Sequence, residues 1–182
     1  PSYFSYIIKN HPDIIKKLDR LGDIDNFYLD SNSIIYDSLR RLSDKYTNDD
    51  EKFEALLIKD VYNQLKGYIK KINAKCIIYI AFDGVAPVAK LQQQRDRRYK
   101  AWYTKELLSS KPSWNSANIT PGTQFMNNLS RRIHKYFANP NKYGVNDLYI
   151  STSTEAGEGE HKLCQYMRDT SHMKKDTVVL YG

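Results

Sequence analysis

The chain has 182 residues and carries 28 Lys and Arg against 21 Asp and Glu, which gives a formal net charge of +7 and a pI near 9.2. Hydrophobic residues make up 41% of the chain, enough to form a core, so a disordered or fibrous protein is excluded. A mean hydropathy of −0.66 without an apolar run near ~18 residues excludes a transmembrane helix, and only 2 Cys exclude a disulfide scaffold. Because the chain shows no cationic-then-apolar leader, we expect an intracellular protein, and its positive charge favours a polyanionic partner such as nucleic acid.

The first half of the chain alternates short apolar runs with longer amphipathic segments. Phe27–Asp30 and Cys76–Asp83 are rich in β-branched and aromatic residues at both parities, as in strands that are buried on both faces. Between them, Ser33–Leu42 and Glu51–Ile72 carry apolar residues at three- and four-residue spacing, which predicts two helices with one apolar stripe each. Val88–Leu108, which is long and basic, is a third expected helix.

The second half continues the alternation. Ser109–Gly122 contains two prolines and little periodicity, which predicts a surface loop. The segment Thr123–Phe137 predicts a helix with Thr123 as its N-cap, and Asn139–Gly144 predicts a second break. Asp147–Ser151 and Thr177–Gly182 are expected strands of the same buried kind.

This order of elements predicts the fold class. Strands that alternate with helices indicate an α/β protein with a mostly parallel central sheet flanked by helices. We expect residues 1–182 to form a single N-terminal domain. The last expected strand is followed by no helix, which indicates a partial domain, truncated at its C-terminal end.

Acidic residues follow three of the expected strands. Asp30 and Asp83 end the first two, and the third is followed by a glycine-containing segment with Glu155, Glu158 and Glu160. Because function in an open parallel sheet collects beyond the carboxyl ends of the strands, these carboxylates are expected to converge at one edge. Their hard oxygens are typical ligands of Mg²⁺ or Mn²⁺, and like charges so close repel unless a cation neutralises them. The alternative is that each Asp is only a turn residue or the N-cap of the next helix.

A basic helix face follows Asp83 by a few residues. At about 100° per residue, four polar side chains fall on one side of the expected helix, namely Lys90, Gln94, Arg97 and Arg98. One ammonium, one amide and two guanidinium groups suit a phosphate, which Arg binds through two hydrogen bonds and Lys as a point charge. The sequence therefore predicts a phosphate pocket beside the expected metal site. The alternative is a solvated basic helix face.

Five segments match the motifs of one protein family, in the family's order: Pro1–Phe4, Asn26–Ile35, Ala81–Arg98, Asn118–Met126 and Gly157–Lys162. The third and the fifth segments are the most specific. On these motifs the chain resembles the N-terminal portion of the catalytic region of the 5′→3′ exoribonuclease (Xrn) family. That family is similar in fold to flap endonucleases and PIN-like nucleases, and the resemblance covers almost the whole chain.

The resemblance implies a processive 5′→3′ exoribonuclease that hydrolyses single-stranded RNA carrying a 5′-monophosphate. It implies a two-metal mechanism that uses Mg²⁺, or Mn²⁺, with two ions in the complete enzyme. The carboxylates that resemble the family's catalytic and metal-binding residues are Asp30, Asp83, Glu158 and Glu160. The residues that resemble its pocket for the 5′-phosphate are Lys90, Gln94, Arg97 and Arg98. No membrane is implied, and no protein partner is specified.

The chain departs from the family pattern at defined places. Ser33 stands where the family has Gly, and Tyr36 stands where the family has a His that stacks on the first base. A Tyr ring can also stack, so Tyr36 is the base-stacking candidate. The family continues past Gly182 into an Asp-x-Asp element that completes its metal site, so residues 1–182 by themselves are expected to have little or no exonuclease activity. Two other functions are therefore kept: a structure-specific flap or PIN-type endonuclease, and a catalytically inactive RNA-binding fragment.

Overall fold

A four-stranded parallel sheet forms the centre of the molecule, in the strand order β3-β2-β1-β4. Its strands are β1 (Asn26–Asp30), β2 (Ile77–Ala81), β3 (Asp147–Ser151) and β4 (Val178–Tyr181). The register pairs Asp30 with Ala81 and Ala81 with Ser151, so three strands end side by side at one edge. The expected α/β fold with a mostly parallel sheet is confirmed.

The computed structural model describes residues 3–14, 23–86, 113–170 and 178–181, together with eight single residues: Val88, Lys90, Gln92, Arg95, Asp96, Tyr99, Lys100 and Tyr103. These eight are helical, as expected for Val88–Leu108. The rest of that expected helix, with Gln94, Arg97 and Arg98, lies outside the described residues. In the described part of the chain, no helix has the length and the apolar composition that crossing a membrane requires.

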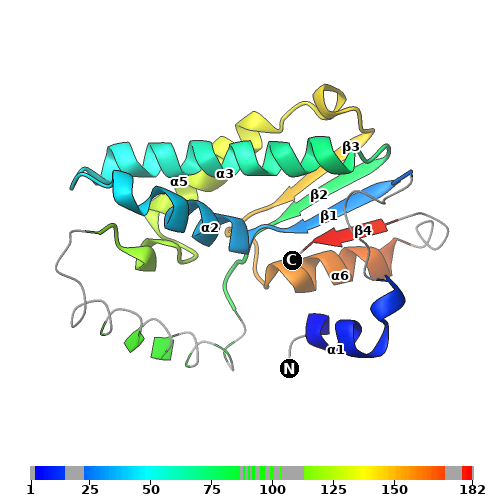
Figure 1. The fold of residues 1–182 in the computed structure, drawn as a ribbon, viewed down its shortest axis with the longest axis horizontal. Helices are drawn as coiled ribbons and strands as arrows, with labels where there is room; N and C mark the ends of the chain where they lie inside the picture. Colours follow the sequence, from blue (N-terminus) through cyan, green and yellow to red (C-terminus); the bar gives the residue numbers. More distant parts are fainter. Residues whose placement is uncertain are drawn as a thin grey trace.

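Helices lie on both faces of the sheet (Figure 1). The α-helices are α1 (Tyr3–Asn10), α2 (Asn32–Leu42), α3 (Asp50–Ile72), α5 (Gln124–Tyr136) and α6 (Gly159–Asp169). Short 3-10 helices are η1 (Pro12–Ile14), η3 (Ser43–Lys45), η4 (Ser116–Asn118) and η5 (Pro140–Tyr143). Helices α3 and α5 cover one face, α6 covers the other, and α1 lies beyond α6.

The ends of the two long helices are fixed by side chains that the sequence supplies. The Asp49 carboxylate accepts a hydrogen bond from the Lys52 amide at 3.0 Å and starts α3, which ends at Asn73 in the left-handed conformation. The Thr123 hydroxyl accepts one from the Met126 amide at 3.3 Å and starts α5, so Thr123 is the N-cap that the sequence predicts. Such a cap contributes about 1 kcal/mol to helix stability.

The core has a larger and a smaller half, one on each face of the sheet. Phe27 and Leu29 of β1 belong to the larger half, together with Leu57 of α3 and Leu129 of α5. On the other face, the fully buried Tyr28 belongs to a smaller cluster with Leu163 of α6. Burying such a side chain stabilises the fold by about 1.5–3 kcal/mol, so both halves hold β1 rigidly between helices.

Some expectations need correction. Strand β3 is not buried on both faces, because it is an edge strand and its Asp147 and Tyr149 side chains are exposed. Strand β2 ends at Ala81 rather than at Asp83, because the chain beyond it turns toward the loop before α6. The described part of Ser109–Gly122 is not only surface loop, since Trp114 and Ile119 are each 4% exposed in the core.

Candidate functional site

The carboxyl ends of β1, β2 and β3 and the first turn of α6 meet at one place (Figure 1). Asp30 is the last residue of β1, and Asp83 follows β2 by two residues. Helix α6 begins at Gly159, so Glu158 and Glu160 flank its first residue. Elements distant in sequence thus bring four carboxylates to the same edge of the sheet.

Asn32 connects the partly buried carboxylates Asp30 and Asp83, and Gly159 also contacts Asp83. The Asn32 side chain donates a hydrogen bond from Nδ2 to Oδ2 of Asp83 at 2.9 Å, and its backbone N–H donates to Oδ1 of Asp30 at 3.4 Å. The Gly159 N–H donates to Oδ1 of Asp83 at 2.8 Å. The Oδ1 atom of Asn32 is buried and has no hydrogen-bond partner among the described residues. Asn32 therefore leaves one oxygen acceptor unused beside the two carboxylates.

Glycine is required at two close approaches around this pair. A Cβ on Gly159 would lie 2.5 Å from Oδ1 of Asp30, so a larger residue would displace that carboxylate. A Cβ on Gly84 would lie 1.6 Å from the carbonyl oxygen of Glu155. There the Gly84 N–H donates to the Gly157 oxygen at 2.8 Å, and the Gly157 N–H donates to the Val85 oxygen at 3.1 Å. These backbone contacts hold the segment after β2 against the loop before α6.

The environment of Asp30 and Asp83 disfavours their negative charge. Burial, and next the charge of Asp83, raise the pKa of Asp30 to about 6. Burial also raises the pKa of Asp83, against the lowering effect of the Gly159 hydrogen bond. Carboxylate oxygens that are gathered and partly desolvated in this way are ligands suited to a hard divalent cation.

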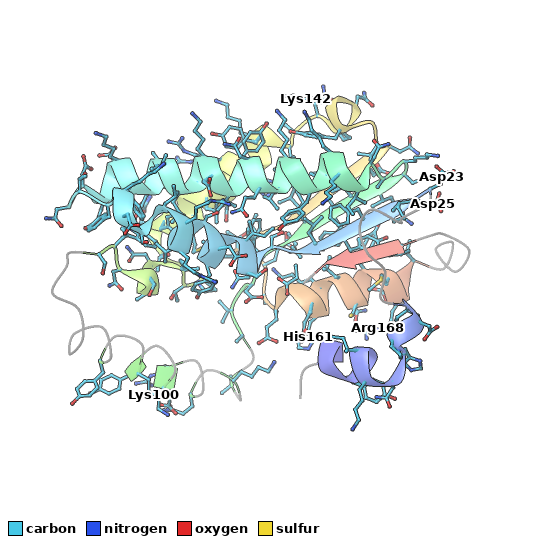
Figure 2. All side chains as sticks on the ribbon, in the orientation of Figure 1. Asp23, Asp25, Lys100, Lys142, His161 and Arg168 are labelled. Carbon is cyan, nitrogen blue, oxygen red and sulfur yellow. The ribbon has the colours of Figure 1, made fainter. Side chains whose placement is uncertain are left out.

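A second group, formed by Glu158, Glu160 and His161, lies on the first turn of α6 at the surface. One ligand atom from each lies within 4.8 Å of the others, so together they can also hold a metal ion. Nδ1 of His161 lies 3.6 Å from Oε2 of Glu158, and Nε2 lies 3.9 Å from Oε1 of Glu160. Nζ of Lys90 lies 2.6 Å from the same Oε2 of Glu158. Figure 2 labels His161 on α6.

Lys162 fixes the backbone around the site. Its ammonium donates to the carbonyl oxygens of Phe82 at 2.8 Å and of Thr152 at 2.9 Å. It thus ties α6 to the chain just beyond β2 and β3. Burial lowers the pKa of Lys162, while the nearby carboxylates Glu155, Asp83 and Asp30 act in the opposite direction.

The structure brings together most, but not all, of the residues singled out in the sequence. Asp30, Asp83, Glu158, Glu160 and Lys90 lie in one region, as described above. Glu155 lies near them, since its charge also acts on Lys162, and its carboxylate accepts a hydrogen bond from the Ser151 hydroxyl at 2.7 Å. Tyr36 is 37% exposed and lies one turn after Asn32 on α2, on the same side of that helix. Gln94, Arg97 and Arg98 lie outside the described residues.

Asn32 and Lys162 were missed in the sequence, and the roles of Gly159 and His161 were not predicted. In the segment Gly157–Lys162, Gly159 was expected only to let the backbone turn between the carboxylates, and His161 was expected to be incidental. Asn32 carried one weak signal, since it stands directly beyond the first strand at the start of a helix. Their contacts depend on which strand ends lie side by side, and sequence spacing alone does not reveal that.

Comparison with known proteins gives a consistent picture. The whole chain, residues 1–182, matches the family described as "XRN 5′-3′ exonuclease N-terminus". It is 32% identical to 5′-3′ exoribonuclease 1 of Saccharomyces cerevisiae over 195 residues, covering 96% of this chain and 12% of the relative. It is 31% identical to 5′-3′ exoribonuclease 1 of Homo sapiens over 191 residues, covering 92% of this chain and 11% of the relative.

A third relative is 5′-3′ exoribonuclease 2 of Kluyveromyces lactis, 26% identical over 233 residues, with 100% of this chain and 23% of the relative covered. The chain therefore spans less than a quarter of the length of each of these curated relatives.

Proposed function

The chain belongs to the XRN 5′-3′ exonuclease N-terminus family, and on this premise we propose that it forms the metal-binding site of a 5′→3′ exoribonuclease acting on 5′-monophosphorylated RNA. The observation that carries the proposal is the meeting of Asp30, Asp83, Glu158 and Glu160 at the carboxyl edge of a parallel sheet. The described elements pack around one sheet, which supports a single nuclease domain over residues 1–182. RNA as the substrate supports an intracellular site of action.

We propose that the carboxylates bind Mg²⁺ or Mn²⁺. The oxygen atoms at the site suit such an ion as ligands. Asp30 and Asp83 offer hard oxygens, and Oδ1 of Asn32 is a further buried oxygen with no partner among the described residues. A cation there would also offset the burial and, next, the repulsion from Asp83 that raise the pKa of Asp30. When bound, a pair of such ions supplies the chemistry of two-metal hydrolysis, which activates the attacking water and stabilises the leaving oxygen.

The residues of this chain have distinct roles in that proposal. Asn32 and the Gly159 amide orient the Asp83 carboxylate, so it is held in place before substrate binds. Lys162 holds the strand ends that carry the site. Such preorganised groups avoid the cost of reorganising during the reaction.

Recognition of the 5′ end is assigned to the basic segment after Asp83. Lys90 supports this role, because its ammonium already reaches the carboxylates at Glu158 and its side chain is 44% exposed. A phosphate beside the carboxylates would be within reach of the same ammonium group. Gln94, Arg97 and Arg98 complete the proposed pocket for the 5′-monophosphate, and Tyr36 is the proposed stacking partner of the first base.

Degradation of a 3′-labelled RNA tests the proposal. Three substrates that differ only in a 5′-monophosphate, 5′-triphosphate or 5′-hydroxyl end are incubated with Mg²⁺ and the complete enzyme that contains this chain, which is also the protein used in the other cleavage tests. The proposal predicts shortening from the 5′ end that is fastest for the monophosphate. Internal cleavage that ignores the 5′ group would favour the flap or PIN-type endonuclease. Binding without cleavage of any substrate would favour the inactive RNA-binding fragment.

A further inference from the structure

A second region of the molecule is strongly basic and lies apart from the candidate site. Residues 61–75 contain four Lys and no Asp or Glu, and residues 113–146 contain two Arg, two Lys and again no acidic residue. These segments form most of α3 together with α5 and η5. Six exposed or partly exposed cations of these elements form what we call the basic face: Lys59, Lys66, Lys70, Arg132, Lys135 and Lys142.

A tyrosine cluster joins the three elements that carry the basic face. The rings of Tyr62 on α3 and Tyr136 on α5 are stacked, with centroids 4.2 Å apart. The Tyr143 hydroxyl of η5 donates to the Tyr136 carbonyl oxygen at 3.0 Å. Nζ of Lys66 lies 5.8 Å from the Tyr62 ring centroid. The cations next to these tyrosines are therefore gathered on one rigid surface.

Helical geometry aligns the cations of α3. At about 100° per residue, Lys59, Lys66 and Lys70 lie on the same side of the helix as Tyr62. Lys59 and Lys70 are separated by about 16 Å along the axis, since an α-helix rises about 1.5 Å per residue.

The cations of the basic face, like several other cations in the described part of the chain, form no ion pair with a carboxylate. Arg40, Arg41, Lys75 and Lys90 each form an ion pair with a carboxylate. No ion pair links a cation of the basic face to any carboxylate in the parts of the chain that the structure describes. A polyanion that binds these cations therefore does not have to displace a carboxylate of the chain from them.

Part of the basic face lies at the other end of the sheet from the carboxylates. The end of α3 leads into the amino end of β2, and η5 leads into the amino end of β3, so Lys70 and Lys142 lie toward the edge opposite the candidate site. In Figure 2, Lys142 lies on the α3 and α5 side of the sheet, whereas His161 lies on the α6 side. A ligand on this part of the basic face cannot be the group that reacts at the carboxylates.

We propose that the basic face binds the phosphate backbone of substrate RNA at a segment away from its 5′ end. The charge and the lack of acidic partners favour a polyanion with regular phosphates, and contacts of this kind supply sequence-independent affinity. The inference rests on the proposed function in one respect only, which is that RNA is the polyanion. It adds a second contact that serves long substrates and leaves short ones unaffected.

Binding of two RNAs, measured by fluorescence anisotropy in the presence of a chelator, tests the proposal. One 5′-phosphorylated RNA has about 30 nucleotides, more than the ~4–16 that one binding site covers, and the other has about 6. The variant carries Lys66→Glu, Arg132→Glu and Lys142→Glu. Losing three phosphate contacts should lower affinity for the long RNA by about 10-fold or more at about 0.1 M salt, and reduce the salt slope by about 2. Affinity for the short RNA should not change.

A matched control variant has the same change of net charge, but its substitutions lie outside the basic face. It carries Lys9→Glu, Lys45→Glu and Lys52→Glu, which are exposed on α1, on η3 and at the start of α3. It should bind the long RNA nearly as wild type does. A neutral variant carries Lys66→Gln, Arg132→Gln and Lys142→Gln and should lose an intermediate amount of affinity for the long RNA. Its thermal unfolding should match that of wild type, so that lost contacts are distinguished from lost folding.

Three outcomes would overturn the inference. They are an unchanged affinity for long RNA in the charge-reversed variant, an equal loss in the control variant, and a loss that affects short and long RNA alike. Retained RNA binding with lost binding of an acidic protein would assign the face to a protein partner instead. Failure of the proposed function is read separately, from whether wild type with Mg²⁺ degrades the short 5′-phosphorylated RNA.

Discussion

The candidate site has a partly buried half, which we call the buried half, and an exposed half, and the two are held in different ways. Asp30 and Asp83 are partly desolvated. Asp83 is fixed by the Asn32 side chain and the Gly159 amide, whereas Asp30 accepts a hydrogen bond from the Asn32 backbone N–H. The carboxylate of Glu160 and the ring of His161 are more than half exposed, at 54% and 57%, and their contacts are at 3.6–3.9 Å. Glu158 links the halves, since it is 16% exposed and pairs with Lys90.

This difference indicates that the two halves of the site have different roles. The buried half cannot move without breaking several hydrogen bonds, so it suits a ligand set that must keep one geometry. The exposed half is free to rearrange, so it suits contacts that change when substrate arrives. We therefore expect substitutions in the buried half to have much larger effects on cleavage than those in the exposed half.

The largest effect is expected for Asp83→Asn. The amide keeps the size of the side chain but removes its charge, so cleavage of RNA should fall by at least about 100-fold, since even indirect partners at metal sites are worth 10–100-fold. Binding of RNA in chelator should be nearly unchanged, because phosphate contacts supply most of the affinity. Single-turnover rates and anisotropy measure the two quantities.

A control for that variant is Asp44→Asn, which changes an exposed carboxylate on η3. It should cleave RNA as wild type does. Near-normal cleavage by Asp83→Asn would show that the buried half is not the catalytic part of the site.

Gly159→Ala should give the next largest effect. Its Cβ would lie 2.5 Å from Oδ1 of Asp30, so the carboxylate must move, and cleavage should fall by about 10- to 100-fold. Overpacking of this kind costs about 1–3 kcal/mol of stability. Rates and urea unfolding of the same preparation separate displacement of the carboxylate from loss of folding.

Gly67→Ala is the matched control for the added methyl group. An added Cβ meets nothing within 4 Å at this position of α3, and Ala in a helix interior is favoured over Gly by about 0.5–1 kcal/mol. The control should therefore be slightly more stable and fully active. Equal activity of the two Ala variants would mean that Asp30 need not keep its position.

A smaller effect is expected in the exposed half. Glu160→Gln should lower the cleavage rate by about 10-fold or less, because water can replace an exposed ligand oxygen. Glu51→Gln, an exposed change in the first turn of α3, should have no effect. The comparison of the two halves would be reversed if Glu160→Gln proved more damaging than Asp83→Asn.

The smallest effect is a pH dependence of stability without metal. The pKa of Asp30 is raised from 3.8 to about 6 in the folded chain, so between these values the folded state binds more protons than the unfolded state. The free energy of unfolding should therefore fall as pH rises through this window and level off above about pH 6. Urea midpoints for wild type and Asp30→Asn in chelator measure this. Parallel curves for both proteins would contradict the buried-half assignment.

The sequence predicts the sheet better than the site. The bounds of β3 coincide with the expected strand, and Thr123 caps α5 as expected, because strand and capping signals are local. Helix α1 was not expected, although Phe4, Ile7 and Ile8 stand at three- and four-residue spacing, because so short a segment gives a weak periodic signal. The edge position of β3 also escaped prediction, because strand order depends on packing between distant segments.

In the site, residue type was predictable and role was not. Asp30 and Asp83 were identified because each follows a strand, and that rule needs no tertiary information. The roles of Asn32 and Gly159 arise from the approach of α6 to the end of β1, which joins segments far apart in the chain. The burial that raises the pKa of Asp30 has the same origin.

Binding of Mn²⁺, followed by the electron paramagnetic resonance signal of the free ion, tests the central claim most directly. Wild type should take up Mn²⁺ with an affinity that falls by at least about 100-fold when Asp30→Asn and Asp83→Asn are combined, and by much less in Glu160→Gln. Affinity of the doubly substituted protein equal to that of wild type would contradict the account, because the buried carboxylates would then not be the metal ligands.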